Sequence, residues 1–270
     1  MALILSSSAV LVSYLYAANG NFALEMLIPI IAAISGTGGM CAMNDYVDVE
    51  ADKLGAGDRP LPSGKISLKN GLMFAIVLTI IGMSVAGLSD KKLLPVMGGI
   101  AVLLGTSYNL KTKGLGLLGT INFGLIMVSV SLLGVVQVTH EIYHSKILLF
   151  CLFVFITASS NQLSANFYDL KSDKIYGYRT IPNTLGIKKA SVLVTIFRLT
   201  SLAVLVLFFI VSEMINFILL IPFVILAILP LISLHFLKQA HDVQNAITGF
   251  RFGIIFTLLS FCTIIIGIYV

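Results

Sequence analysis

The strongest constraint on the fold is a series of apolar stretches, each about 20 residues long, the length of a helix that crosses a bilayer core. They predict nine membrane-spanning helices, at about residues 2–18, 23–43, 70–89, 93–109, 115–138, 147–166, 190–212, 214–236 and 247–269. Only 11% of the 270 residues are charged, whereas a soluble domain carries about 25%. We therefore expect an all-α polytopic membrane protein, a bundle of nine transmembrane helices forming a single domain over residues 1–270.

Charged residues between the spans indicate how the bundle is oriented. Most lysines and arginines follow the second, fourth, sixth and eighth spans, whereas Lys91, Lys92 and Lys146 lie at the opposite end. Because cytoplasmic loops carry the excess of Lys and Arg, we expect a cell-membrane protein in which the end that carries most of these basic residues faces the cytoplasm. No basic run is dense enough to predict nucleic-acid binding, and the three cysteines, all in apolar stretches, predict neither a disulfide framework nor a zinc site.

An acidic cluster stands at the end of the second span. Asp45, Asp48 and Asp52 are spaced i, i+3 and i+7, so on one helix they would share a face. Like charges on one face repel, and near a bilayer each is costly to desolvate. Carboxylates are ligands for a divalent cation such as Mg²⁺, so we expect one among them. The Gly/Pro-rich loop that follows contains Arg59 and Lys65, which are suited to binding an anion beside that metal.

The same spacing recurs after the sixth span, where Asn166, Asp169 and Asp173 are in register with the first three acids. One acidic helix end could be a solvated face at the membrane edge. Two copies, each followed by a basic loop, instead favour a central site shared by two halves of an internally duplicated bundle. The predicted metal-binding residues are Asn44, Asp45, Asp48, Asp52, Asn166, Asp169 and Asp173.

This combination of groups indicates a substrate that is both anionic and apolar. Metal ions and basic side chains can neutralise the charge that develops on a departing phosphate group. An apolar bundle beside them suits a long hydrocarbon tail, and a polyprenyl diphosphate meets both requirements. A cation-coupled transporter is the alternative from another class, but transporters tend to hold carboxylates near the bilayer midplane rather than at helix ends.

At these residues the chain resembles the UbiA superfamily of intramembrane prenyltransferases. Asn44, Asp45, Asp48 and Asp52 match the first motif of that family, and the pair after the sixth span matches the second. The resemblance implies Mg²⁺-assisted ionisation of an allylic diphosphate and capture of the carbocation by an acceptor. The catalytic residues it implies are Asp45, Asp48, Asp52, Asp169 and Asp173.

The diphosphate-binding residues follow from the basic loops and from this resemblance. Many members carry a tyrosine with a lysine four residues later, but Thr112 occupies that position here, between two lysines. Which lysine meets the diphosphate therefore stays open. The candidates are Arg59, Lys65, Tyr108, Lys111, Lys113, Lys174 and Arg179.

Within the superfamily, the run from Asp58 to Lys65 looks most like archaeal digeranylgeranylglyceryl phosphate synthases. This implies transfer of a geranylgeranyl group from its diphosphate to geranylgeranylglyceryl phosphate, a lipid acceptor of ether-lipid synthesis, within membrane lipid. An aromatic or tetrapyrrole acceptor, as in quinone or chlorophyll pathways, is the alternative.

Other polar residues lie inside the predicted spans. Arg198 is near the middle of the seventh, where we expect it to pair with a carboxylate or to face a cavity. Asn122, Gln137, Asn161 and Gln162 are expected to form hydrogen bonds between helices.

Overall fold

The computed structural model describes residues 1–55 and 58–270, and every regular element in these ranges is helical. The nine long helices follow the predicted spans, with ends shifted by a few residues. They are α1 (Ala2–Ala17), α2 (Leu27–Val47), α4 (Leu68–Gly87), α5 (Leu93–Ser107), α6 (Leu117–Val138), α7 (Ser145–Ala165), α10 (Ile187–Val211), α11 (Leu220–Lys238) and α12 (Val243–Tyr269). The short elements are η1 (Leu24–Met26), α3 (Val49–Gly55), η2 (Tyr108–Thr112), α8 (Leu170–Ile175), α9 (Ile181–Leu185) and η3 (Phe217–Leu219).

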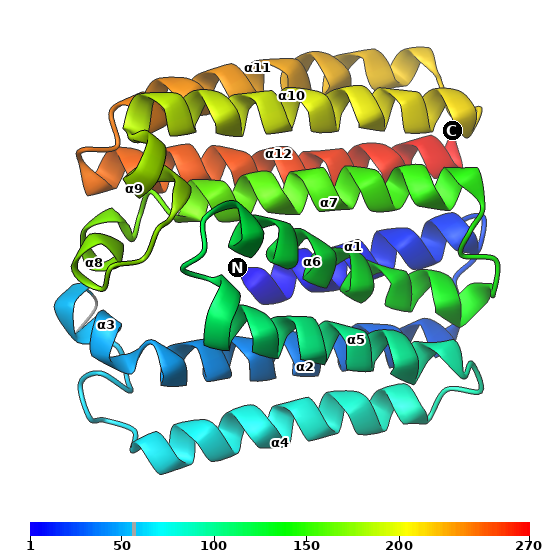
Figure 1. Cartoon of the computed structure of the whole chain (residues 1–270). Coiled ribbons are helices and arrows are strands. Elements are labelled where there is room, and N and C mark those ends of the chain that lie inside the picture. The colour runs from blue at the N-terminus through cyan, green and yellow to red at the C-terminus, as the bar shows by residue number, and fades with distance from the viewer. Residues whose placement is uncertain (56–57) are drawn as a thin grey trace.

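Eight helical segments in the described ranges are long and apolar enough to cross a membrane, one of them formed by α5 together with η2 (Leu93–Thr112), which confirms an integral membrane protein. The ninth predicted span, α1, is apolar but has only 16 residues. At 1.5 Å per residue it is about 24 Å long, shorter than a bilayer core of about 30 Å. The prediction of nine full spans is therefore right for eight helices, and α1 is a shorter helix inside the same bundle (Figure 1).

The helices form two groups that share one bundle (Figure 1). In the first group α2 packs on α4, and α5 packs on α6; in the second, α7 packs on α10, and α11 packs on α12. α1 joins the groups because it contacts α2, α6 and α12. The pair α1–α2 leads into α3, and the pair α6–α7 leads into α8, so the two halves repeat the same succession of elements. α3 and α8 contact each other, which brings the ends of the two repeats together.

Close packing within the first group depends on small residues. A Cβ atom at Gly82 of α4 would lie 2.8 Å from the backbone N of Gly36 in α2 and 3.0 Å from the carbonyl O of Ala32. Glycine therefore lets the two backbones approach, as is common between helices in membranes. In the second group, buried rings form the core; the fully buried ones include Phe150, Phe153, Phe208, Phe209 and Phe256.

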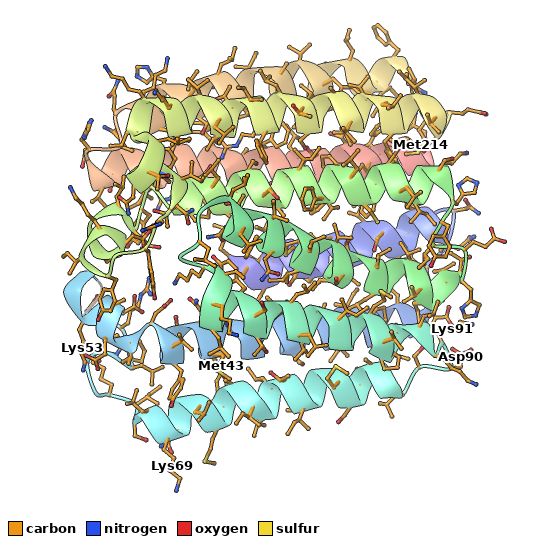
Figure 2. The ribbon with its side chains drawn as sticks, in the orientation of Figure 1. Met43, Lys53, Lys69, Asp90, Lys91 and Met214 are labelled. Carbon is orange, nitrogen blue, oxygen red and sulfur yellow. The ribbon has the colours of Figure 1, made fainter. Side chains whose placement is uncertain are left out.

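The two ends of the bundle differ in the elements that they carry. The short helices α3, α8 and α9 gather at one end, where Lys53 and Lys69 also lie, whereas Asp90 and Lys91 lie at the other (Figures 1 and 2). The chain ends near the second of these, where the Tyr269 hydroxyl donates to the carbonyl O of Gly20 at 2.6 Å. Because both acidic motifs adjoin α3 and α8, the first end is the one that carries the candidate site.

Candidate active site

The first acidic motif lies where one helix ends and another begins. α2 ends at Val47, Asp48 takes a turn conformation (φ −87°, ψ 2°), and α3 starts at Val49. The N–H of Asp48 donates to Asn44 O at 2.9 Å, and the N–H of Asp52 donates to Asp48 O at 2.8 Å. The three acids therefore lie on two consecutive helices and the residue between them, because the helix is interrupted at Asp48. Helix-like hydrogen bonds nevertheless continue through the break.

The second motif has the same arrangement at the end of α7. Asn166 caps α7, and Asp169 immediately precedes α8. The N–H of Asp173 donates to Asp169 O at 2.8 Å, as Asp52 does to Asp48. Asn166 is buried and accepts a hydrogen bond from Gln162 Nε2 at 3.1 Å. Because α3 and α8 are in contact, the two sets of acids meet at one end of the bundle.

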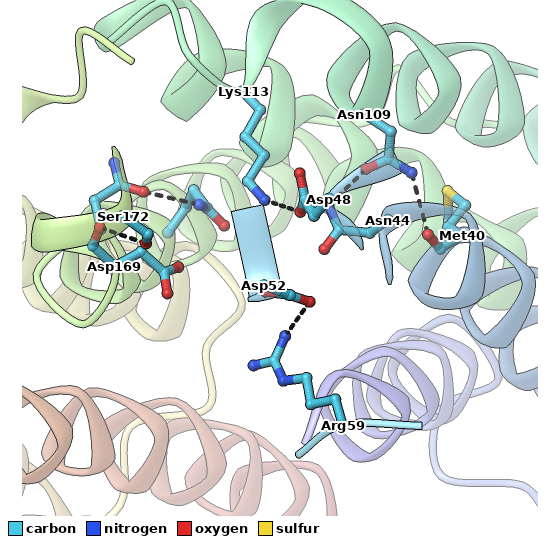
Figure 3. A network of polar contacts seen from close by, with 11 residues as sticks. Met40, Asn44, Asp48, Asp52, Arg59, Asn109, Lys113, Asp169 and Ser172 are labelled. Atoms are coloured by element: carbon cyan, nitrogen blue, oxygen red, sulfur yellow. Dashed lines mark hydrogen bonds and ion pairs between the residues drawn. The ribbon is translucent and has the colours of Figure 1, made fainter. Parts of the chain in front are cut away.

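Two basic residues pair with the acids of the first motif (Figure 3). Lys113 donates to Asp48 Oδ2, and Arg59 Nη1 donates to Asp52 Oδ2 at 2.8 Å. Asp48 is only 5% exposed, and its second oxygen, Oδ1, is buried without a hydrogen-bond partner in the described part of the chain. One side of a buried carboxylate is therefore available to a cation.

A π-helical turn places Lys113 at the site. Residues Tyr108–Thr112 form η2, in which the N–H of Lys113 donates to the O of Tyr108, five residues earlier, at 3.1 Å. An α-helix would make this bond over four residues, so the turn contains one additional residue. Lys113 lines the cavity described below, whereas Lys111 is exposed and does not.

Asn109 belongs to the same network, although the sequence analysis assigned it no role. Its Oδ1 accepts from Asn44 Nδ2 at 3.2 Å, and its Nδ2 donates to the O of Met40 at 3.1 Å (Figure 3). It thereby connects the end of α5 to the start of the first motif. The sequence does contain a signal for this role, because Asn109 is a polar residue at the end of an apolar stretch, directly after Tyr108.

The remaining basic candidates lie elsewhere. Lys65, Lys174 and Arg179 are exposed and do not line the cavity. Arg179 contributes its backbone, because its N–H donates to the O of Gly114 at 2.9 Å and so ties the loop after η2 to the loop after α8. Tyr108 is buried and does line the cavity.

A cavity of about 1100 Å³ opens among these groups. At the acidic end it is lined by Asp45, Asp52, Arg59, Lys113 and Asp169. From there it continues between α6, α7 and α12, where it is lined mostly by apolar side chains. On α7 the lining residues run from 165 to 154, about 16 Å of helix and roughly half the thickness of a bilayer core. The cavity thus joins a charged mouth to a long apolar interior.

Burial, together with the crowding of the carboxylates, raises their pKa values. Burial, followed by the negative charge of Asp169, raises the pKa of Asp173 from its ordinary 3.8 to about 7. Burial also raises the pKa of Asp169, and the positive charges of Lys113 and Arg59 offset part of this rise. Burial lowers the pKa of Lys113, but the carboxylates of Asp48, Asp169 and Asp173 together outweigh this effect and raise it overall. Ionising all the acids together is therefore unfavourable unless more positive charge enters the site.

These observations test whether the residues fit a divalent cation. In residues 1–55 and 58–270, no group of three His, Cys, Asp or Glu side chains is already gathered as a metal site. The donors are nevertheless carboxylate oxygens, the class that Mg²⁺ prefers. Asp48 Oδ1 has no hydrogen-bond partner among the described residues, and burial raises the pKa values of Asp169 and Asp173, so a cation bound here would stabilise the ionised carboxylates. The residues therefore fit Mg²⁺, provided that Lys113 and Arg59 release their carboxylates.

Arg198 does not pair as expected. It is 1% exposed and donates to Ser233 and, at 2.8 Å, to Ser164 Oγ. Within the part of the chain that the structure covers it forms no ion pair with a carboxylate, and it lies behind the cavity wall rather than facing the cavity. Serine hydroxyls on α7 and α11 instead accept from its two terminal nitrogens, while its buried Nε has no hydrogen-bond partner in the described part of the chain.

Two of the four residues named, Asn122 and Asn161, form the predicted hydrogen bond to another helix, whereas Gln137 bonds to Ser89 in the loop between α4 and α5. Asn122 Nδ2 donates to the O of Leu104 at 3.3 Å, Gln137 Oε1 accepts from Ser89 Oγ at 2.9 Å, and Asn161 Nδ2 donates to Thr257 Oγ1 at 2.8 Å. Gln162 differs because its partner, Asn166, caps its own helix.

Comparisons with known proteins agree with this architecture. The model of the UbiA prenyltransferase family matches residues 6–263. A digeranylgeranylglyceryl phosphate synthase from Methanococcoides burtonii is 30% identical over 252 residues, covering 91% of this chain and 86% of that protein. Among solved structures, a UbiA homologue from Aeropyrum pernix K1 matches with a TM-score of 0.80 at 17% identity, covering 98% of both chains. A UbiA homologue from Archaeoglobus fulgidus, bound to DMAPP and Mg²⁺, matches with a TM-score of 0.68 at 14% identity and 97% coverage of both.

Proposed function

This chain belongs to the UbiA prenyltransferase family, and we propose that residues 1–270 act as one domain that transfers a polyprenyl group from its diphosphate to a lipid acceptor. One observation carries the proposal: the cavity has carboxylates and cations at its mouth and a long apolar interior. A diphosphate matches the mouth, and a hydrocarbon tail matches the interior. The bound Mg²⁺ of the Archaeoglobus fulgidus homologue supports a magnesium-dependent reaction.

The acids and basic residues at the mouth divide the work. We assign Mg²⁺ binding to Asp45, Asp48, Asp52, Asp169 and Asp173. When bound, the ion neutralises charge on the diphosphate as it departs. Lys113 and Arg59 pair with Asp48 and Asp52, and with these carboxylates holding Mg²⁺ the two basic side chains would be free to donate to diphosphate oxygens. Asn44 and Asn109 hold the end of α2 in place through their mutual hydrogen bond.

The chemistry requires no strong base. The bond between the allylic carbon and the diphosphate oxygen breaks, and the oxygen keeps the electron pair. The hydroxyl oxygen of the acceptor then forms a bond to that carbon, and its proton passes to the diphosphate or to a carboxylate of the site. Asp52 is a candidate for that carboxylate because it lines the cavity mouth. Preorganised charge, rather than a nucleophile of the protein, supplies the acceleration.

For the substrates, we propose geranylgeranyl diphosphate as donor and geranylgeranylglyceryl phosphate as acceptor. The relative from Methanococcoides burtonii, named a digeranylgeranylglyceryl phosphate synthase, supports this choice. The cavity is also large, at about 1100 Å³, as two long-chain substrates require. The excess of lysine and arginine at the acidic end supports a cell-membrane location with that end in the cytoplasm.

The test is transfer of radiolabel from geranylgeranyl diphosphate by the purified protein in the presence of Mg²⁺. Geranylgeranylglyceryl phosphate, an aromatic acid and a tetrapyrrole are offered in parallel as acceptors. We expect label only in the ether lipid, and none in any product after EDTA treatment. Label in an aromatic or tetrapyrrole product would overturn the substrate assignment. Failure to release diphosphate with any acceptor would overturn the proposed function.

A further inference from the structure

Beyond the acids, the cavity has two walls of different chemistry. The wall contributed by α6 is apolar, with Phe123, Ile126, Met127 and Val130 facing the space. The wall contributed by α7 and α12 carries polar groups among its apolar ones. These are Thr157, Asn161, Gln162 and Thr257. All four lie within the helical spans, where a polar side chain facing only hydrocarbon is costly.

The polar wall is held by hydrogen bonds that join helices. Asn161 Nδ2 donates to Thr257 Oγ1 at 2.8 Å, which ties α7 to α12, and Thr257 Oγ1 in turn donates to Gly253 O at 3.0 Å. Thr157 and Ser201 share a hydrogen bond that ties α7 to α10. Asn161 is 6% exposed, and Thr257 takes only one of its two amide hydrogens. Because Asn161 lines the cavity, the second hydrogen can be offered to a ligand there.

Arg198 lies directly behind this wall. A Cβ atom at Gly253 would overlap its Nη2 and would lie 2.8 Å from Asn161 Oδ1, so the guanidinium and the amide oxygen converge on that glycine. A guanidinium has donors only, so its positive charge favours the amide oxygen on its side and directs the amide nitrogen away. Burying this cation without a carboxylate is costly, which indicates that the position serves a function.

The chemistry of the two substrates decides which wall each one contacts. The tail of a polyprenyl diphosphate contains only carbon and hydrogen, so polar groups beside it would be left without partners. A lipid acceptor built on glycerol carries hydroxyl and ether oxygens at the start of its chain. We propose that the donor tail lies along α6 and the acceptor along α7 and α12, with Asn161 as a specificity-determining residue that donates to an acceptor oxygen. Arg198 is its positioning residue. This assignment rests on the proposed function.

Equilibrium binding to the full-length protein in lipid nanodiscs tests the assignment without requiring turnover. The probes are geranylgeranylglyceryl phosphate and an unreactive thiolo analogue of geranylgeranyl diphosphate. Asn161→Leu should raise the Kd of the first about tenfold, since one hydrogen bond worth about 1.4 kcal/mol is lost, and should change the second less than twofold. Met127→Gln, on the opposite wall, should instead raise the Kd of the diphosphate analogue about tenfold and change the Kd of geranylgeranylglyceryl phosphate less than twofold. Asn21→Leu, an exposed asparagine outside the cavity, should change neither.

Arg198→Lys tests the positioning role, because one ammonium is not expected to reproduce the fork that reaches both Ser164 and Ser233. It should raise the acceptor Kd several-fold in the wild-type background and add little to Asn161→Leu, since both changes act on one amide. Additive effects would overturn the role of Arg198. If this variant does not fold, Asn161→Leu alone decides: equal weakening of both ligands, or of neither, would overturn the wall assignment. Wild-type protein that binds both probes but transfers no label would refute only the proposed function.

Discussion

The π-helical turn η2 gives a sharp prediction, because it determines which residue delivers the cation to the site. Lys113 reaches Asp48, whereas position 112, four residues after Tyr108, carries a threonine. The perturbation is an exchange of these two neighbours, Thr112→Lys together with Lys113→Thr. It keeps the composition, the charge and the chain length. The tie between Gly114 O and the N–H of Arg179 therefore still holds the loop in register.

The magnitude follows from helix geometry. Neighbouring residues differ by about 100° around a helix, and side chains extend about 5–6 Å from its axis, so the exchange moves the ammonium by about 8 Å. At an effective dielectric constant of 20, an ammonium about 4 Å from a unit negative charge is stabilised by about 4 kcal/mol, and one about 12 Å away by about 1.4 kcal/mol. The difference of about 2.8 kcal/mol corresponds to a loss of about a hundredfold in kcat/KM.

The assay is the rate of diphosphate release with saturating acceptor, measured as kcat/KM for the prenyl diphosphate. Thr112→Val is the matched control, because Thr112 Oγ1 accepts from Asn122 Nδ2 at 2.8 Å and the exchange also removes this bond. The control should lose less than about tenfold, the value of one hydrogen bond. An exchange variant within threefold of wild type, or a control as impaired as the exchange, would refute the reasoning.

Three further predictions concern the metal, the packing and the topology. Asp169→Asn should lower kcat about 100- to 1000-fold while the protein stays folded by circular dichroism, because an electrostatic group of the site is lost; an unchanged kcat would contradict its assignment to the metal. Gly82→Ala should cost about 1–3 kcal/mol and lower the thermal unfolding midpoint, because its methyl group would meet the α2 backbone, whereas Gly87→Ala, with open space around it, should not. Cysteine introduced at Ser63 should resist an impermeant thiol reagent in intact cells, whereas cysteine at Ser89 should react; equal labelling of both would refute the cytoplasmic orientation.

Hydropathy and motif spacing predicted the architecture because each pattern is contained within one short segment of the chain. The apolar stretches gave all nine long helices, with errors of a few residues at their ends. The repeated acidic spacing indicated that two distant segments meet, and the contact between α3 and α8 agrees with this. The bilayer makes these inferences strong, because a charged cluster at a helix end has few alternatives to facing a polar site.

Side-chain destinations were harder to predict, because they depend on details that spacing does not encode. An additional residue in a helical turn rotates everything after it, so Lys111 and Lys113 could not be distinguished before the π-helical turn of η2 was seen. The partners of Arg198 were missed because serine hydroxyls on two other helices, rather than one acid, accept from its terminal nitrogens. The break at Asp48 was missed because the residues around it have no helix-breaking composition.

The central claim is that the two acidic motifs form one metal site that a prenyl diphosphate completes. Electron paramagnetic resonance of Mn²⁺ with the purified protein tests this directly, with and without the unreactive thiolo analogue of geranylgeranyl diphosphate. We expect the analogue to tighten Mn²⁺ binding in the wild type. Either Asp45→Asn, in the first motif, or Asp169→Asn, in the second, should abolish this tightening. Mn²⁺ binding that ignores the analogue, or that survives unchanged in both variants, would contradict the claim.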